Sequence, residues 1–464
     1  MSTVFATWLD GTAVAAGRVP PVPESYAAAG ISQEAVTDLL LKTLYVQGAR
    51  TGQQLADAIA LSFPLLDELL LPLQQRRMVE VRGTAGTGRV AYVFDITASG
   101  RERAREAMEL NQYVGPAPVP LAQYRERLEA QTIRDLHVDR ERIREGFRDM
   151  VLSPDVYEEL GPAINSAKSV FLFGDPGNGK TMIAECIARM FGGSMYVPYA
   201  VEMDGQVILV HDPIYHRPPD DSDPAGDDGG AGLSSIWRRT EAEHDRRYAR
   251  VRRPVVVAGG ELTLDQLDLR YDPTTKVYQA PFQVKANGGV LIIDDFGRQR
   301  VPPRDLLNRW IVPLEKRTDY LALHTGSKFP VPFDCLLVFA TNLEPMDLVD
   351  EAFLRRIHYK INVHSPSREE LTEIFRRVCG RMGIPFSPSG VEFLYRHYYG
   401  PGRVAPRACH PRDIADHVRD VARFRQLPVE LSDELLDAAC RSYFIELSAG
   451  PDSGRSAAVP VAGR

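Results

Sequence analysis

The sequence predicts an α/β protein in which helices cover both faces of a parallel sheet, with a smaller α+β domain before it and a helical domain after it. Short apolar segments alternate with helical patterns, which is typical of a parallel sheet. A glycine-rich loop follows the first apolar segment, and only helical patterns occur from Ser367 to about Leu447. The expected strands are Val170–Phe173, Met195–Val197, Val290–Ile293, Cys335–Ala340 and Tyr359–Val363.

Length and composition exclude several classes of protein. A chain of 464 residues is too long for one hydrophobic core, so we expect two or three domains. The net charge of −7 argues against a protein whose whole surface binds nucleic acid. The sequence contains no readable secretory signal and no long apolar run, so we expect a cytoplasmic protein without a membrane span. Its five widely spaced cysteines, without a CxxC pair, predict neither a zinc site nor a disulfide framework.

The region before the parallel sheet has the element order of a winged helix. Three segments with helical spacing precede two alternating segments around the turn GTAGTG, and a short helix follows. A Pro-rich stretch then marks a domain boundary. The predicted organisation is a flexible arm (1–29), a winged-helix domain (30–111), a linker (112–121), an α/β core (122–365) that includes a flexible acidic insertion (217–234), a helical lid (366–447) and a disordered tail (448–464).

The motif GDPGNGKT, Gly174 to Thr181, predicts a phosphate-binding loop. Its glycines let the backbone wrap closely around phosphate, and the following helix adds its positive end. We expect Lys180 to reach the β and γ phosphates of ATP and Thr181 to offer its hydroxyl to Mg²⁺. A glycine-rich structural turn is the alternative. The loop nevertheless follows an apolar strand and opens a helical segment, which is the context that the motif requires.

Polar residues also follow two later apolar strands. The segment GGVLIIDDF ends in Asp294, which we expect to orient the Mg²⁺ shell, and Asp295, which we expect to activate the attacking water. The segment CLLVFATN ends in Asn342, which would lie near the γ-phosphate if its strand neighbours the previous one. A buried strand can end in Asp, and Asn is common in turns, for structural reasons alone. The order of these segments after the phosphate-binding loop favours the catalytic interpretation.

Together these motifs resemble the AAA+ ATPase family over roughly residues 160–444. The resemblance implies that the glycine-rich loop is Walker A, that Asp294 and Asp295 form Walker B, and that Asn342 is sensor 1. Many members carry Asp-Glu at Walker B, so the Asp-Asp of this chain predicts that hydrolysis could be slow. The residues implied to contact ATP are Asp175, Pro176, Gly177, Asn178, Gly179, Lys180, Thr181, Met182 and Arg412, with Thr181 and Asp294 holding Mg²⁺.

The same resemblance implies a homo-oligomer, commonly a hexameric ring. The segment DEAFLRRIHYKI is similar to the arginine-finger region of the family, with Arg356 as the preferred finger and Arg355 as the alternative. A finger can stabilise γ-phosphate charge only from a neighbouring subunit. The segment HPRD resembles sensor 2, and its arginine is Arg412.

Two features resemble the MoxR-like branch of the family. The approach YQAPFQVKANGG to Walker B is one, and the segment YLALHTGSKFPVPF, which would form a β-hairpin before the sensor 1 strand, is the other. The GAFTGA loop of enhancer-binding members is absent from the sequence. Transcriptional activation of that type is therefore not expected.

The accessory regions leave the partner open. Residues 31–110 contain nine basic and ten acidic residues, so a winged helix there favours protein docking over DNA binding. The segment 237–253 has seven Arg against three acids with Trp237 and Tyr248 interleaved, and could bind single-stranded nucleic acid. A solvated helix with Glu243–Arg247 pairing is the favoured alternative. The segment HDPIYH, with His211 and His216, is a weak candidate for a metal site.

The sequence therefore predicts a Mg²⁺-dependent ATPase that acts as a chaperone-type remodeller of a protein partner. A DNA-transaction ATPase, such as a loader or initiator, is the second interpretation, supported by Asp-Asp and the Arg-rich segment. A nucleotide-dependent switch with little turnover is the third. Membrane association is not expected.

Overall fold

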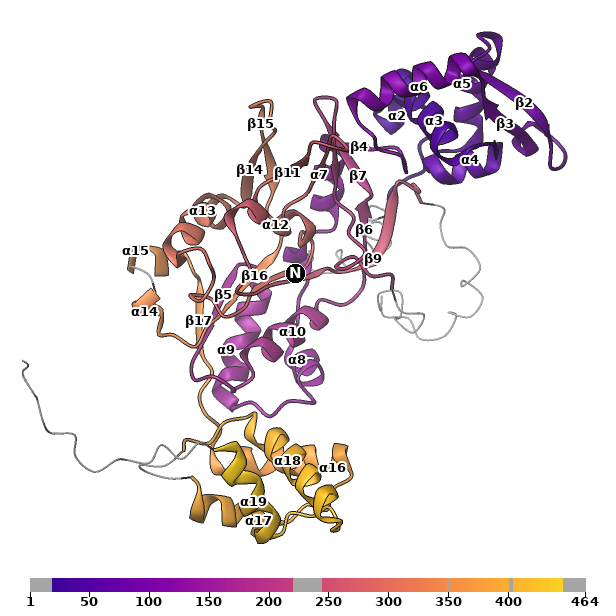
Figure 1. Ribbon diagram of the computed structural model, residues 1–464. Coiled ribbons are helices and arrows are strands. Elements are labelled where there is room, and N and C mark those ends of the chain that lie inside the picture. Colours follow the sequence, from indigo (N-terminus) through magenta and orange to yellow (C-terminus); the bar gives the residue numbers. More distant parts are fainter. Residues whose placement is uncertain (1–18, 220–243, 349–350, 400–403, 445–464) are drawn as a thin grey trace, which may run out of the picture. The chain divides into compact units, whose positions relative to one another are not determined.

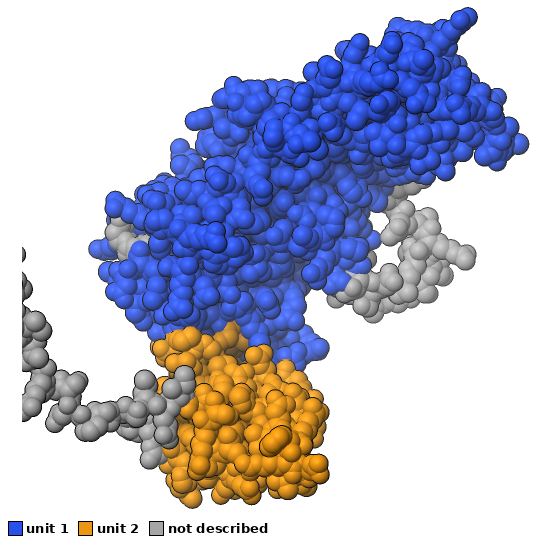
Figure 2. All heavy atoms as spheres, in the orientation of Figure 1, with its two compact units in different colours: residues 1–149, 154–174, 180–363 blue, residues 150–153, 175–179, 364–464 orange. Residues whose placement is uncertain are grey.

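The computed structural model describes residues 19–219, 244–348, 351–399 and 404–444. It divides into two compact units, which Figure 2 colours separately. The first unit comprises the chain to Asp149, residues 154–174 and residues 180–363. The second comprises residues 150–153, residues 175–179 and the chain from His364. Five residues of the glycine-rich loop thus group with the C-terminal helices.

A five-stranded parallel sheet forms the centre of the first unit (Figure 1). In spatial order its strands are β10 (Val255–Ala258), β13 (Val290–Ile293), β16 (Leu336–Ala340), β5 (Ser169–Phe173) and β17 (Tyr359–Asn362). Of these five strands, β5 comes first in the chain, and it lies between β16 and β17, which come last. Because all strands are parallel, β5, β13 and β16 end at the same edge of the sheet, and the predicted α/β fold is confirmed there.

The prediction of the sheet strands was wrong at one position. Met195–Val197 belongs to β6 (Ser194–Pro198), which pairs antiparallel with β9 (Tyr248–Arg252) in a separate two-stranded sheet. The outer strand of the parallel sheet is β10, which the sequence analysis did not identify. Both runs are short and apolar, and such a run does not reveal the strand that will pair with it.

A second five-stranded sheet, which the sequence did not predict, lies in the same unit. Its strand order is β11 (Arg270–Asp272), β12 (Val277–Gln279), β8 (Gln206–Leu209), β7 (Ala200–Met203) and β4 (Val119–Pro120). Strand β4 comes from the stretch predicted to be a linker and pairs with β7 through Val119 and Val201.

Helices pack against the parallel sheet through large apolar side chains. Trp310 of α13 (Pro303–Lys316) is fully buried, and its ring lies 5.9 Å from that of Phe339 in β16. After α13, β14 (Thr318–Ala322) and β15 (Lys328–Pro332) form the predicted hairpin. The other helices of this region are α7 (Leu121–Ala130), η2 (Ile133–Asp135), α8 (Arg140–Gly146), α9 (Pro154–Asn165), α10 (Lys180–Met190), η3 (Leu264–Leu267), α12 (Phe282–Lys285), α14 (Pro345–Leu348) and α15 (Glu351–Leu354).

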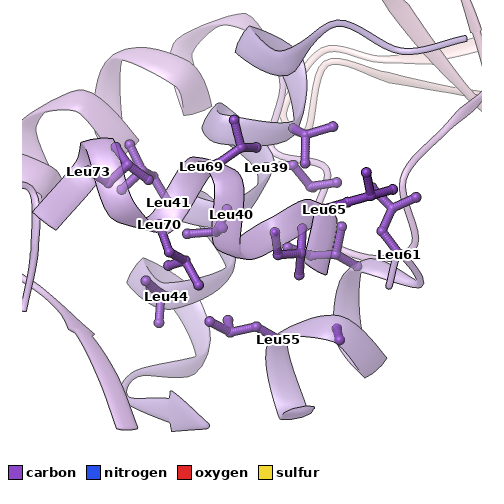
Figure 3. Close-up of a cluster of buried hydrophobic side chains, with 14 of the residues drawn as sticks. Leu39, Leu40, Leu41, Leu44, Leu55, Leu61, Leu65, Leu69, Leu70 and Leu73 are labelled. Carbon is purple, nitrogen blue, oxygen red and sulfur yellow. The ribbon is translucent and has the colours of Figure 1, made fainter. Parts of the chain in front are cut away.

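The N-terminal region packs around a cluster of leucines, which Figure 3 shows. Its three-stranded antiparallel sheet has the order β1-β3-β2. Tyr26 is buried in this cluster, so α2 is ordered, although it falls within the range predicted to be a flexible arm. The elements are α2 (Tyr26–Ala29), α3 (Gln33–Gln47), β1 (Arg50–Thr51), α4 (Gly52–Ile59), α5 (Phe63–Gln75), β2 (Val79–Thr84), η1 (Arg89–Ala91), β3 (Tyr92–Ile96) and α6 (Ala98–Leu110).

In the described part of the second unit, four helices pack around a separate hydrophobic core. These helices are α16 (Arg368–Met382), α17 (Pro388–His397), α18 (His410–Arg425) and α19 (Asp433–Tyr443). Across the described residues of both units, no helix combines the length and the apolar character needed to cross a bilayer. The tail predicted from residue 448 and most of the acidic insertion lie outside the described residues.

The Arg-rich segment does not form the predicted solvated helix where the structure describes it. Residues 248–252 form strand β9, and Arg247 is buried with only 1% of its side chain exposed. Glu243, its expected partner, lies outside the described residues, and Arg247 instead pairs with Asp245 at 2.7 Å. A solvated helix would have kept this guanidinium at the surface, whereas Arg247, just before β9, lies in the interior and donates from Nη1 to the carbonyl oxygen of Ala29.

Candidate functional site

The glycine-rich loop adopts backbone angles that explain its glycines. Gly174, Gly177 and Gly179 have φ values of 127°, 85° and 83°, which disfavour residues with a Cβ atom. A Cβ on Gly174 would also lie 2.5 Å from the carbonyl oxygen of Val363. Substitution there would therefore force the loop away from the end of β17, so the loop can turn tightly only with glycine.

Lys180 is the first residue of α10, and its side chain reaches back to Gly174, where the glycine-rich loop begins. Its Nζ donates a hydrogen bond to the carbonyl oxygen of Gly174 at 2.9 Å, and the residue is only 7% exposed. A largely buried ammonium group needs electronegative partners, and an anionic phosphate is the strongest that a ligand can supply. Met182, by contrast, lies on an exposed face of α10.

The hydroxyl of Thr181 and the carboxylate of Asp294 meet at the edge where the parallel strands end. Thr181 Oγ1 donates to Asp294 Oδ2 at 2.9 Å and lies 3.0 Å from Oδ1. Asp294 directly follows β13, and Thr181 lies one residue into α10. Two hard oxygen donors at this spacing fit Mg²⁺, which usually takes one or two protein oxygens and completes its shell with water and phosphate. Accordingly, the described residues contain no cluster of three or more His, Cys, Asp or Glu side chains suited to a metal.

Asp295 and Asn342 also meet, at the ends of β13 and β16. Asn342 Nδ2 donates to Asp295 Oδ1 at 3.4 Å, and Asp295 is exposed. Asp295 has φ +49°, in the left-handed region that a non-glycine residue enters at a cost of about 1 kcal/mol. Such strained residues concentrate at functional sites. The carboxylate is therefore held at the surface of the sheet edge with an amide beside it.

The two candidate finger arginines have different surroundings. Both follow α15, and Arg356 Nε forms an ion pair with Glu315 Oε1 of α13 at 2.5 Å. Arg355 is exposed and forms no ion pair with any residue that the structure describes. The preferred finger, Arg356, would thus have to leave a carboxylate of its own subunit to reach a neighbour.

In the second unit, the middle of the glycine-rich loop contacts the turn before α18. The amide of Cys409 donates to the carbonyl oxygen of Gly177 at 2.9 Å, and the amide of Ala408 donates to Asn178 Oδ1 at 3.3 Å. Asn178 Nδ2 also donates to Ser365 Oγ, whose hydroxyl lies 3.4 Å from Asp175 Oδ2. These contacts tie the polar residues of the loop to the C-terminal helices.

Arg407, which the sequence analysis did not single out, lies against this loop. Its Cδ is 3.5 Å from the position that a Cβ on Gly177 would take, and its Nε is buried without a hydrogen-bond partner among the described residues. Arg412, the arginine predicted from HPRD, is 68% exposed and pairs with the adjacent Asp413 at 3.4 Å. The sequence offered no signal for Arg407, because only contact with the loop distinguishes it from other arginines.

The histidine of HPRD has a structural role. His410 is buried, its Nδ1 lies 3.1 Å from the hydroxyl of Tyr399, and the two rings stack. Burial lowers the pKa of His410 to about 4, so its imidazole is neutral at physiological pH. It anchors the start of α18 rather than supplying charge.

A family model matches the C-terminal helices, and solved structures match the chain at low sequence identity. A family model described as Domain of unknown function (DUF8689) matches residues 367–442, and no curated protein matches the chain. The RuvB Holliday junction branch migration motor of Thermotoga maritima aligns with 15% identity over 63% of this chain and 70% of its own, with a TM-score of 0.35. NtrX of Brucella abortus in complex with ATP aligns with 15% identity over 73% of this chain and 69% of its own, with a TM-score of 0.37. At these low values the fold assignment rests on the sheet order and the loop geometry.

Proposed function

We propose that this chain binds and hydrolyses ATP with Mg²⁺ as an AAA+ ATPase. The observation that carries the proposal is the meeting of Thr181 with Asp294 at the sheet edge where Lys180 is held in the glycine-rich loop. The strand order supports it, because ligands of open α/β sheets bind beyond the carboxyl ends of the strands. The site combines a cation for phosphate with oxygen donors for a divalent metal.

Each residue has a role that its position allows. The loop amides and Lys180 bind the phosphates, and Thr181 and Asp294 hold Mg²⁺, which neutralises charge on the phosphate oxygens. Asp295 accepts the proton of the attacking water, and Asn342, which donates to that carboxylate, orients it. Arg407 adds positive charge at Gly177, a role that the resemblance had given to Arg412.

We further propose a ring-forming remodeller of a protein partner, with Arg356 or Arg355 acting as the finger. The hairpin of β14 and β15, which precedes the strand carrying Asn342, supports the MoxR-like branch. A hexamer would place the finger at the site of the next subunit, where an arginine in trans typically contributes a factor of roughly 10³ or more.

The N-terminal region is proposed to be a winged helix that docks protein. Its element order and its β1-β3-β2 sheet support the assignment. Arg89, which lies between β2 and β3, pairs with Asp67 of α5 at 2.8 Å. Glu68 adds a second acid to that helix. A helix with this charge gains little from phosphate contacts, so DNA binding is the second candidate function.

The test is equilibrium binding of ATP to the wild type and to Lys180→Ala, with and without Mg²⁺, together with phosphate release. We expect the wild type to bind and hydrolyse ATP, and Lys180→Ala to lose binding. Arg105→Ala, which removes an exposed arginine of α6, is the matched control and should behave as wild type. Equal affinity of wild type and Lys180→Ala would refute the loop assignment.

The partner is tested separately with the full chain. Asp295→Asn, held in its ATP state, should retain a protein partner on purification. Stimulation of wild-type hydrolysis by duplex DNA, with a steep dependence on salt, would instead favour the second candidate.

A further inference from the structure

A buried ion pair fixes the described part of the Arg-rich segment, residues 244–253, which the proposed ATPase site does not use. Arg247 and Asp245 are 1% and 4% exposed, and their charged groups lie 2.7 Å apart. Arg247 Nη1 also donates to the carbonyl oxygen of Ala29 at 2.7 Å, and the amide of Asp245 donates to that of Pro20. This anchor holds the neighbouring residues, Arg246 and strand β9, in a defined position.

A cleft of about 510 Å³ opens beside this anchor. It lies between the end of α4, the loop after β8 and strand β9, and none of its lining residues belongs to the proposed ATPase site. Its volume falls in the range of roughly 300–1,000 Å³ that is usual for small-ligand sites. Aromatic and basic side chains of its lining include Tyr199, His211, His216, His244, Arg246 and Arg250.

Aromatic rings form one wall of the cleft. The ring of His211 lies 4.9 Å from that of Tyr199 and 5.4 Å from that of His216, with which it stacks. His216 Nδ1 accepts a hydrogen bond from the amide of Asp212, so its Nε2 donates to the carbonyl oxygen of Lys285 at 2.9 Å. Both nitrogens of His216 are therefore engaged, and its ring is held in one orientation. A second pair, Tyr196 and His244, lies 5.0 Å apart.

The imidazole rings of His211 and His216 are uncharged at neutral pH. Burial lowers the pKa of His216 to about 4 and also lowers the pKa of His211. In His216 the neighbouring His211 reinforces the lowering, whereas the hydrogen bond to the carbonyl oxygen of Lys285 opposes it. Asp212 opposes the lowering in both histidines. Neutral imidazole and phenol rings offer flat faces on which a planar ligand can stack, without repelling it by charge.

Two arginines also line the cleft. Arg250, on β9, donates from Nε to Ser194 Oγ at 2.9 Å, and Arg246 pairs with Asp57 of α4 at 2.5 Å. The lining thus contains two guanidinium groups and one carboxylate, and the Arg246–Asp57 pair is about half exposed. Guanidinium groups match the geometry of phosphate oxygens and can bind them bidentately.

We propose that this cleft binds a nucleotide unit, with its base against the Tyr199–His211–His216 wall and its phosphate at Arg246 and Arg250. The unit could come from a free nucleotide or from single-stranded nucleic acid, because both present a planar base linked to phosphate. Stacking on aromatic rings beside a basic groove is the usual means of binding such strands without sequence preference. The cleft is thus a second nucleotide site, distinct from the glycine-rich loop.

The test uses full-length Lys180→Ala, in which the loop should not hold nucleotide. Binding of a fluorescent oligothymidylate and of labelled ADP is measured by anisotropy at two salt concentrations. We expect binding of at least one probe that weakens as salt rises, because phosphate contacts release counterions. Binding of the strand alone identifies nucleic acid as the source, and binding of ADP identifies a free nucleotide.

Substitutions in the cleft then locate the site. Tyr199→Ala, which removes a ring for stacking, and Arg250→Ala, which removes a phosphate contact, are each added to Lys180→Ala. Each should weaken binding by about tenfold. Arg105→Ala and Tyr320→Ala remove an exposed arginine and an exposed tyrosine elsewhere and should have no effect. Arg250→Lys, also added to Lys180→Ala, retains the charge and guards against a variant that simply fails to fold. Its affinity should lie between that of Lys180→Ala and that of Lys180→Ala with Arg250→Ala.

Two results would overturn the proposal. One is that neither probe binds to Lys180→Ala at low salt. The other is that binding is unchanged by both Arg250→Ala and Tyr199→Ala in folded protein. Neither result bears on the ATPase, which is measured on the wild type, so the two proposals fail independently.

Discussion

The proposed ATPase site and the cleft beside β9 are built in opposite ways. Asp294 and Asn342 of the first come after β13 and β16, and Thr181 comes after the loop that follows β5. Because these strands are parallel neighbours in one sheet, the topology brings the three residues to one edge. The residues of the second come from α4, the loop after β8 and β9, and meet only because a separate antiparallel pair forms. A site at strand ends can be recognised from local motifs, whereas a site between unrelated segments cannot.

Two adjacent arginines show the same contrast at the scale of single residues. Arg246 is about half exposed and its ion pair with Asp57 is open to solvent, whereas Arg247 is buried with Asp245. Water screens the Arg246–Asp57 pair, so that pair is weak. The buried guanidinium of Arg247 depends on Asp245, because water cannot replace that carboxylate in the interior. Two arginines that are neighbours in the sequence therefore have different roles. Arg246 is the proposed ligand contact, and Arg247 is a structural anchor.

The largest expected effect concerns the arginine finger. Arg356→Ala or Arg355→Ala should bind ATP almost normally but lose roughly 10³-fold or more in hydrolysis if that residue is the finger. Mixing the inactive finger variant with Lys180→Ala should restore activity, because some interfaces then pair an intact loop with an intact finger. Steady-state phosphate release and sedimentation with ATP measure both. A monomeric protein with full activity would contradict the ring.

Asp295→Asn should retain ATP binding and lose about 10²–10⁴-fold in turnover, because an amide cannot accept the proton of water. The measurement is single-turnover phosphate release at saturating ATP. Asp305→Asn, at an exposed position of α13, is the matched control and should leave turnover unchanged. Turnover at the wild-type rate in Asp295→Asn would place the base at another residue.

Asp245→Ala should lower the free energy of unfolding of the first unit by about 3–5 kcal/mol, since it strands the buried guanidinium of Arg247. Asp57→Ala removes the partner of the exposed Arg246 and should cost no more than about 1 kcal/mol. Urea denaturation of both variants makes the comparison. Similar losses of unfolding free energy in the two variants would mean that burial does not make the Arg247–Asp245 pair more important for stability than the Arg246–Asp57 pair.

The smallest effect is a dependence of stability on pH. Because the pKa of His216 falls from about 6.5 to about 4 on folding, the unfolded state binds more protons between these values. Stability should therefore fall as pH drops through this window, by up to about 1.4 kcal/mol per pH unit. Urea midpoints at several pH values should show a shallower slope in His216→Gln than in the wild type. His410, whose pKa is also lowered to about 4, should contribute a separate slope that His410→Gln removes.

The sequence by itself determined the centre of this protein. The glycines of the loop, the acids after β13 and the amide after β16 were identified because their residue types depend on the local backbone and strand ends. The hairpin of β14 and β15 and the C-terminal helices were also predictable, since each follows from short-range periodicity and turns. In these regions the signal lies within about ten residues of the feature that it predicts.

Only the tertiary structure decided the rest. Whether Met195–Val197 or Val255–Ala258 joins the parallel sheet depends on which strand each one pairs with, and no short apolar run encodes its partner. The burial of Arg247 and the contact of Arg407 with Gly177 likewise depend on segments far apart in the chain. The identity of a charged residue in the sequence does not show whether its side chain will lie at the surface or in the interior. Its environment, and hence its role, is fixed only when distant backbone and side-chain groups close around it.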